Sequence, residues 1–271
     1  MKKINHMKFF SKTGMLPLFI LVVFPTLLFA QAVKTQNSKN MKLKKVLIVV
    51  TSASIVPGNG KSTGIWLEEF AAPYYLFKEQ GLDITVASPK GGQAPVDPKS
   101  MSPDYTTESV RRFLQDPDAQ AALTHTIPLE QVKASDYDAL YYPGGTGPVW
   151  DLPENTYSIR LIESSYNDGK PTALVCHAPA ALKNVKDNNG QPLVKGKKIA
   201  GYSNSEEAAG QSSDMVPFSL ETMLRNEGAI YVKGDDWHSF SVAEANLITG
   251  QNPASSLAVA QQVVDQLATS K

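Results

Sequence analysis

The residues best suited to chemistry are Cys176, the only cysteine of the chain, and His177, which follows it directly. The apolar run over 173–175 is typical of a buried parallel strand, and the Ala and Pro residues after His177 suit a helix. A sharp strand-to-helix turn lifts a nucleophile above a sheet, and the helix field lowers the pKa of a thiol. The pattern therefore predicts a nucleophilic cysteine with a lowered pKa, and the alternative is an inert core cysteine.

Carboxylates stand where they could assist the thiol. Glu68 and Glu69 are neighbours on a predicted helix over 64–80, where adjacent side chains point about 100° apart. Glu69 precedes the apolar Phe70, so we expect it to face inward, act as a general acid or base, and hydrogen-bond the thiolate while protonated. The alternative is a pair of solvated helix charges. Glu207 could orient His177 as a base.

Gly144 and Gly145 directly follow a predicted strand over 139–142. Glycine lets backbone amides approach a substrate oxygen closely, as an oxyanion site requires, although an ordinary tight turn is the alternative. The chain has no HxxxH, HExxH or CxxC spacing and no phosphate-binding loop. We therefore expect neither a metal site nor a cofactor.

Strand patterns alternate with helix patterns along the chain, which predicts an α/β fold with a mostly parallel sheet covered on both faces. Ligands in such folds bind beyond the carboxyl ends of the strands, where three loops should meet: 144–145, 176–177 and 203–207. The expected strands are 46–50, 82–87, 139–142, 172–175, 198–202, 229–233 and 246–249. The expected helices are 64–80, 108–123 with a break at 116–117, 155–167, 218–226 and 254–268, and another begins at 206–207.

Residues 1–32 have the pattern of a signal peptide: a lysine-rich start, an apolar stretch over 16–29 and small residues at Ala30 and Ala32. Export to the periplasm or outside the cell is expected, with no stable membrane insertion after cleavage; an uncleaved anchor is the alternative. Residues 33–43 form a polar tether and 44–271 a single domain. The formal net charge is zero, which argues against a nucleic-acid partner.

Several short motifs occur together in this chain: Val-Cys-His-Ala-Pro over 175–179, Pro-Gly-Gly over 143–145, Thr-Gly-x-x-x-Glu-Glu over 63–69, and the segments 87–92, 201–207 and 249–255. In combination they resemble the ThiJ/PfpI superfamily, which is glutamine amidotransferase-like, and within it the heat-shock chaperone and glyoxalase III branch. The resemblance covers nearly everything from Lys44 to the C-terminus. Two positions depart from the common family pattern: Thr146 stands where a histidine is frequent, and Ala178 where a glycine is frequent.

The resemblance implies a flavodoxin-like three-layer sandwich, usually a homodimer, with a nucleophile-elbow cysteine. It implies that Cys176 is the nucleophile, Glu207 the acidic partner of His177, and Glu69 the carboxyl beside the thiol. The amides of Gly145 and His177 match the family's oxyanion site. The implied activity is that of a glyoxalase III or D-lactate dehydratase-type lyase, which converts an aldehyde such as methylglyoxal to D-lactate without glutathione or metal. Alternatives are a stress-related holdase and an amidase, peptidase or amidotransferase-like hydrolase.

Overall fold

The computed structural model describes residues 43–269. The predicted signal peptide, 1–32, and the predicted tether apart from Leu43 lie outside the described residues. Within 43–269, no helix is both long enough and apolar enough to cross a membrane.

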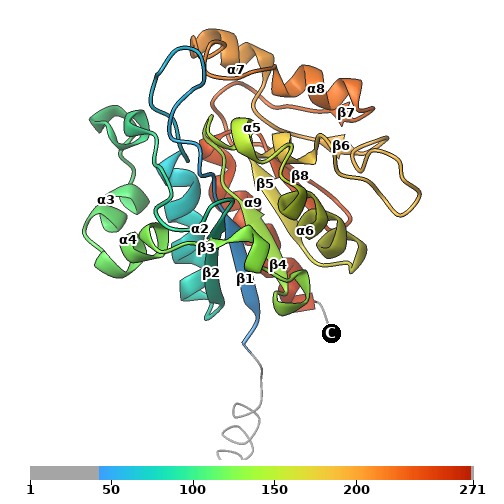
Figure 1. The fold of residues 1–271 in the computed structure, drawn as a ribbon, viewed down its shortest axis with the longest axis horizontal. Helices are drawn as coiled ribbons and strands as arrows, with labels where there is room; N and C mark the ends of the chain where they lie inside the picture. Colours follow the sequence, from blue (N-terminus) through green and yellow to red (C-terminus); the bar gives the residue numbers. More distant parts are fainter. Residues whose placement is uncertain (1–42, 270–271) are drawn as a thin grey trace, which may run out of the picture. The chain divides into compact units, whose positions relative to one another are not determined.

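The centre of the domain is a seven-stranded sheet in the order β3-β2-β1-β4-β5-β9-β8 (Figure 1). All neighbouring strands pair in parallel except β8, which is antiparallel to β9. This confirms the predicted fold class. The strands span Lys45–Val49 (β1), Asp83–Ser88 (β2), Ile127–Pro128 (β3), Ala139–Tyr142 (β4), Thr172–Val175 (β5), Ser241–Glu244 (β8) and Leu247–Gly250 (β9).

Helices cover both faces of the sheet and complete three layers (Figure 1). The helices α2 and α9 pack against each other on one face, and α6 packs on β4 and β5 from the other. The helices span Leu67–Glu79 (α2), Glu108–Leu114 (α3), Pro117–Thr124 (α4), Pro148–Asp151 (α5), Thr156–Asn167 (α6), Asn204–Ala209 (α7), Leu220–Asn226 (α8) and Ser256–Thr269 (α9). Short 3₁₀ turns lie at Pro98–Met101 (η1), Pro103–Tyr105 (η2), Leu129–Gln131 (η3), Ala134–Asp136 (η4), Ala178–Leu182 (η5) and Pro253–Ser255 (η6).

The middle strands are almost continuously apolar because helices cover them on both sides. Every residue of β4 and β5 is buried, and the β1 strand is buried from Val46 onward. Phe70 and Phe77 of α2 are fully buried under this sheet, and Phe77 meets Tyr141 edge to face with ring centroids 5.6 Å apart. The rigid core therefore fixes the carboxyl ends of β4 and β5, where the candidate residues lie.

Three predictions about elements were wrong in part. The segment after Cys176 is the 3₁₀ helix η5, not an α-helix, so the aligned dipoles expected at its start are few. The strands predicted over 198–202 and 229–233 shorten to Lys198–Ile199 (β6) and Ile230–Tyr231 (β7), which form a separate two-stranded parallel sheet. The strands β3 and β8 and the helix α5 were not predicted, because each is short and lacks a clear period.

Candidate active site

Cys176 follows the last residue of β5 and adopts a left-handed backbone, with φ of 60°. Such a φ is rare for a residue with a side chain and persists only where the surroundings fix it. Here the Cys176 N–H donates to the Gly250 carbonyl at 2.9 Å, and the Cys176 carbonyl accepts from the Tyr202 N–H at 2.8 Å. Backbone bonds on both sides thus hold the predicted elbow in place.

Gly144 and Gly145 allow the end of β4 to come against the cysteine. A Cβ on Gly144 would lie 2.9 Å from the Cβ of Cys176 and 2.6 Å from the Val175 carbonyl oxygen. Gly145 has φ of 90°, and its Cβ would lie 2.5 Å from the Trp66 nitrogen. Glycine is therefore required at both positions, because a side chain at Gly144 would push the loop away from Cys176 and one at Gly145 would push it away from residues 64–66.

His177 and Glu207 meet the thiol in one chain of contacts. The Cys176 Sγ lies 3.5 Å from the His177 Nδ1, and the His177 Nε2 lies 2.8 Å from the Glu207 Oε2. Both side chains are buried. Burial alone would raise the pKa of Glu207, but hydrogen bonds and charge attraction from His177, with a hydrogen bond from Ser212, outweigh it and lower that pKa.

The ionised Glu207 decides the tautomer of the histidine. A carboxylate accepts only, so the His177 Nε2 carries the hydrogen, and Nδ1 is left with a lone pair toward the sulfur. His177 can then take the thiol proton, and Glu207 stabilises the imidazolium that results.

Glu69 faces the interior, as predicted, and its side chain is completely buried. Its Oε2 accepts from the Gly144 N–H at 2.7 Å. Its Oε1 has no conventional hydrogen-bond partner within 43–269, although the carboxyl interacts with the Cys176 thiol. Burial raises the pKa of Glu69 to about 8, so the carboxyl is protonated at neutral pH.

The predicted lowering of the Cys176 pKa is wrong in this structure. Burial raises the pKa of the thiol well above its usual range, and the Glu69 charge raises it further, while the Gly145 N–H acts in the opposite direction. The physical reason is that η5 is a five-residue 3₁₀ turn, whose field is small against the desolvation of a buried thiolate. His177 is the group placed to act as a base for this thiol.

The candidate oxyanion donors divide into two groups. The Gly144 N–H is already committed to Glu69, so Gly144 shapes the loop but does not donate to a substrate oxygen. The Gly145 N–H points at the thiol, and the His177 N–H has no acceptor in the described part of the chain. The Gly145 and His177 amides are therefore the two candidate donors to a substrate oxyanion.

The sequence profile described as the DJ-1/PfpI family matches residues 63–266. The chain belongs to this family. The curated Glyoxalase 3 of Candida albicans is 29% identical over 229 residues, which cover 81% of this chain and 97% of the relative.

Solved structures also resemble this chain over most of its length. The Francisella tularensis Rapid Encystment Protein of 24 kDa matches with a TM-score of 0.79 and 35% identity, covering 83% of this chain and 99% of that one. The glyoxalase III structure from Candida albicans matches with a TM-score of 0.76 and 28% identity, covering 82% of this chain and 96% of that one.

In this DJ-1/PfpI protein, a cavity of about 940 Å³ opens over Cys176 and His177. Gly145 and Thr146 line the cavity, whereas Glu69 and Glu207 are not among its lining residues. Thr146, which replaces the loop histidine frequent in the family, pairs its hydroxyl with that of Thr63 at 2.7 Å. That position therefore supplies no base to the cavity.

Sequence reasoning missed several lining residues. Glu68, the alternative to Glu69, is half-buried in the cavity wall, accepts a hydrogen bond from Thr107, and has its pKa raised by burial. Its position next to Glu69 in the sequence could have indicated that Glu68 also lies near the site. The aromatic residues Trp66, Tyr105, Tyr202 and Trp237 also line the cavity, although they come from four separate segments. Within the described residues, no group of three His, Cys, Asp or Glu side chains is placed to hold a metal ion.

Proposed function

We propose that this protein is a glutathione-independent glyoxalase, which converts methylglyoxal and water to lactate. One observation carries the proposal: the Cys176 thiol lies 3.5 Å from a histidine nitrogen whose partner nitrogen is held by a buried carboxylate. The relative and the solved structure named as glyoxalases, which the chain matches over most of its length, support the same activity.

The first step is attack on the aldehyde. His177 Nδ1 takes the thiol proton, and the sulfur forms a bond to the aldehyde carbon of methylglyoxal. The electron pair of the C=O bond moves to oxygen, within reach of the Gly145 and His177 amides. Protonation of this oxygen from the imidazolium gives a hemithioacetal and restores neutral His177.

The second step moves a proton between neighbouring carbons. His177 accepts the proton from the former aldehyde carbon, and the electron pair moves through a new C=C bond to the neighbouring carbonyl oxygen, which forms an enediolate. The hydroxyl proton of the former aldehyde carbon passes to this oxygen, and the imidazolium returns its proton to the adjacent carbon, which yields a lactoyl thioester on Cys176 and neutral His177. Glu69, protonated at neutral pH, is the available buried acid beside the sulfur. Water then attacks the thioester, the C–S bond breaks, and lactate leaves with the thiol restored. The face of reprotonation sets the product as the D form, in this proposal.

The test is a lactate assay with purified protein, methylglyoxal and no glutathione. We expect the wild type to form lactate, the Cys176→Ala variant to show none above the protein-free rate, and Glu207→Ala to fall by about 100-fold, since a general base contributes roughly 10²–10⁴. Tyr157→Ala, on the exposed surface of α6, is the matched control and should retain full activity. Equal rates for wild type and Cys176→Ala would overturn the proposal. A D-specific lactate dehydrogenase reads the stereochemistry.

We further propose that residues 1–32 direct export and that the protein is a homodimer. The first rests on the sequence of that segment and the second on the family resemblance alone. Sequencing the N-terminus of the exported protein and measuring its molar mass by light scattering test them. The holdase and hydrolase alternatives have no specific support among the described contacts.

A further inference from the structure

The cavity over Cys176 is much larger than methylglyoxal, whose two carbonyl carbons carry only a hydrogen atom and a methyl group. A volume of about 940 Å³ is in the range of pockets that bury whole drug-sized ligands. The nucleophile lies at one part of its wall, so most of the space lies beyond the position of the reacting carbons.

Two pairs of aromatic side chains line this remaining space. Trp66 and Tyr105 meet edge to face with ring centroids 4.9 Å apart. The ring centroids of Tyr202 and Trp237 lie 5.9 Å apart, and the Tyr202 ring also lies against the His177 ring, tilted by 31° with centroids 4.3 Å apart. The second pair thus extends an aromatic wall from the catalytic base outward.

Two of these rings are exposed, and two of the charged groups beside them already have partners. Trp237 and Tyr105 expose 50% and 42% of their surface. By contrast, Lys61 forms an ion pair with Asp214, and Glu68 accepts from Thr107. The exposed apolar surface of the cavity therefore includes aromatic rings, and exposed apolar surface in a pocket marks a ligand contact.

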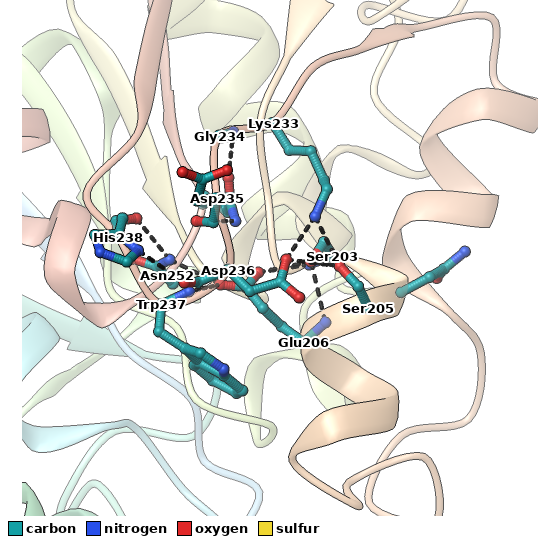
Figure 2. A network of polar contacts seen from close by, with 12 residues as sticks. Ser203, Ser205, Glu206, Lys233, Gly234, Asp235, Asp236, Trp237, His238 and Asn252 are labelled. Atoms are coloured by element: carbon teal, nitrogen blue, oxygen red, sulfur yellow. Dashed lines mark hydrogen bonds and ion pairs between the residues drawn. The ribbon is translucent and has the colours of Figure 1, made fainter.

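Trp237 is held in place by a built network. Its backbone is left-handed, with φ of 65°, which is an outlier for a bulky residue. The fully buried Glu206 fixes it: Oε1 accepts from the Trp237 N–H at 2.9 Å and from the Asn252 Nδ2 at 2.8 Å. Figure 2 shows Glu206 among these partners, with the indole ring pointing away from them.

The same glutamate also caps the helix that carries Glu207. Glu206 Oε2 accepts from the Ser203 N–H at 3.1 Å and the Ser203 hydroxyl at 2.8 Å, which completes a capping box at the start of α7. One buried carboxylate therefore positions both the acidic partner of His177 and the ring of Trp237.

We propose that this cavity is a substituent subsite and that the enzyme takes 2-oxoaldehydes bearing an aromatic group, with Trp237 as the specificity-determining residue. The inference rests on the proposed function and narrows its substrate class. The aldehyde carbon meets Cys176, while the aromatic substituent lies against the Trp237 and Trp66 rings. Aromatic rings gain both from burial and from edge or offset stacking.

The test compares phenylglyoxal with methylglyoxal. For the wild type we expect kcat/KM for phenylglyoxal to exceed that for methylglyoxal at least tenfold, since even one methylene in an apolar pocket is worth roughly 10–200-fold. Trp237→Ala should lose most of this preference through a higher KM for phenylglyoxal, so that the ratio of the two kcat/KM values falls toward one. Trp237→Phe should recover part of it. Tyr157→Ala, equally exposed but outside the cavity, should change neither.

A wild type that prefers methylglyoxal, or a Trp237→Ala variant that loses both substrates equally, would overturn the subsite. If the wild type turns over neither aldehyde, the proposed function fails. A binding measurement then tests the aromatic subsite independently of turnover. Calorimetry with mandelate and lactate, the two products, on Cys176→Ala provides that measurement. Tighter binding of mandelate that disappears on adding Trp237→Ala supports the subsite, and equal or absent binding overturns it.

Discussion

At the residue scale, the decisive feature is a buried thiol that does not ionise by itself. Burial raises the pKa of Cys176, and the amide of Gly145 offsets only part of this effect. In the proposed mechanism, reactivity therefore comes from the histidine at 3.5 Å, whose other nitrogen is held by Glu207. This arrangement places the proton acceptor beside the nucleophile. It also keeps the fraction of free thiolate small, which limits unwanted oxidation of Cys176.

The pH dependence of alkylation tests this account. We expect iodoacetamide labelling of Cys176 to have its midpoint above that of free cysteine, about 8.5. Glu69 ionises near pH 8, and at higher pH its negative charge raises the pKa of the Cys176 thiol. Glu69→Gln should therefore shift the midpoint downward. A wild-type midpoint below the free value would refute the burial argument. An unchanged midpoint in Glu69→Gln would show that the Glu69 carboxyl does not affect the pKa of the thiol.

At the scale of elements, the site is where the ends of β4 and β5 come into contact. The two strands are neighbours in the sheet, and the glycines after β4 let its loop lie directly on the elbow. The Trp66 N–H at the start of α2 donates to the Gly144 carbonyl at 3.1 Å, so the helix that carries Glu69 is tied to the same loop. The candidate catalytic groups Cys176 and Glu69 are thus both tied by backbone contacts to the loop after β4.

Gly144→Ala tests that contact. The new methyl group would meet backbone atoms at 2.6–2.8 Å, which cannot move aside cheaply. Overpacking of this kind costs about 1–3 kcal/mol, so we expect a lower free energy of unfolding together with strongly reduced lactate formation. Gly190→Ala is the control, because its methyl group would face open space and only its φ of 74° is unfavourable. Similar losses of activity in both variants would argue against a special role for the loop.

At the scale of the whole molecule, Glu69 couples folding stability to pH. Its pKa is 4.5 when unfolded and about 8 in the folded protein, where burial disfavours the charge. Between these values the unfolded chain has released a proton that the folded protein keeps. Stability from this group is complete below pH 4.5 and is lost as pH rises toward 8.

Urea unfolding of wild type and Glu69→Gln at several pH values measures this coupling. The variant cannot ionise, so its free energy of unfolding relative to wild type should increase with pH, by up to roughly 1.4 kcal/mol per unit between 4.5 and 8. Asp151, whose pKa burial raises to about 6, has the same sign of effect but is present in both proteins and cancels. A constant difference across this range would contradict a raised pKa at Glu69.

The sequence alone determined the local features of this protein. The apolar runs of β1, β4 and β5 predicted a parallel sheet because strands buried on both faces carry no polar alternation. Local patterns also singled out the candidate residues. The Cys-His pair and the double glycine each follow a predicted strand directly, and Glu69 precedes an apolar residue on a predicted helix. The α/β class and the family resemblance followed from such local signals.

The tertiary structure decided what depends on distant segments meeting. The pKa of Cys176 follows from burial and from the charge of Glu69, more than a hundred residues earlier in the chain, and not from the turn that follows it. The commitment of the Gly144 amide to Glu69 and the aromatic wall around Trp237 arise in the same way. Desolvation and contacts between elements have no period in sequence, so only the folded chain fixes them.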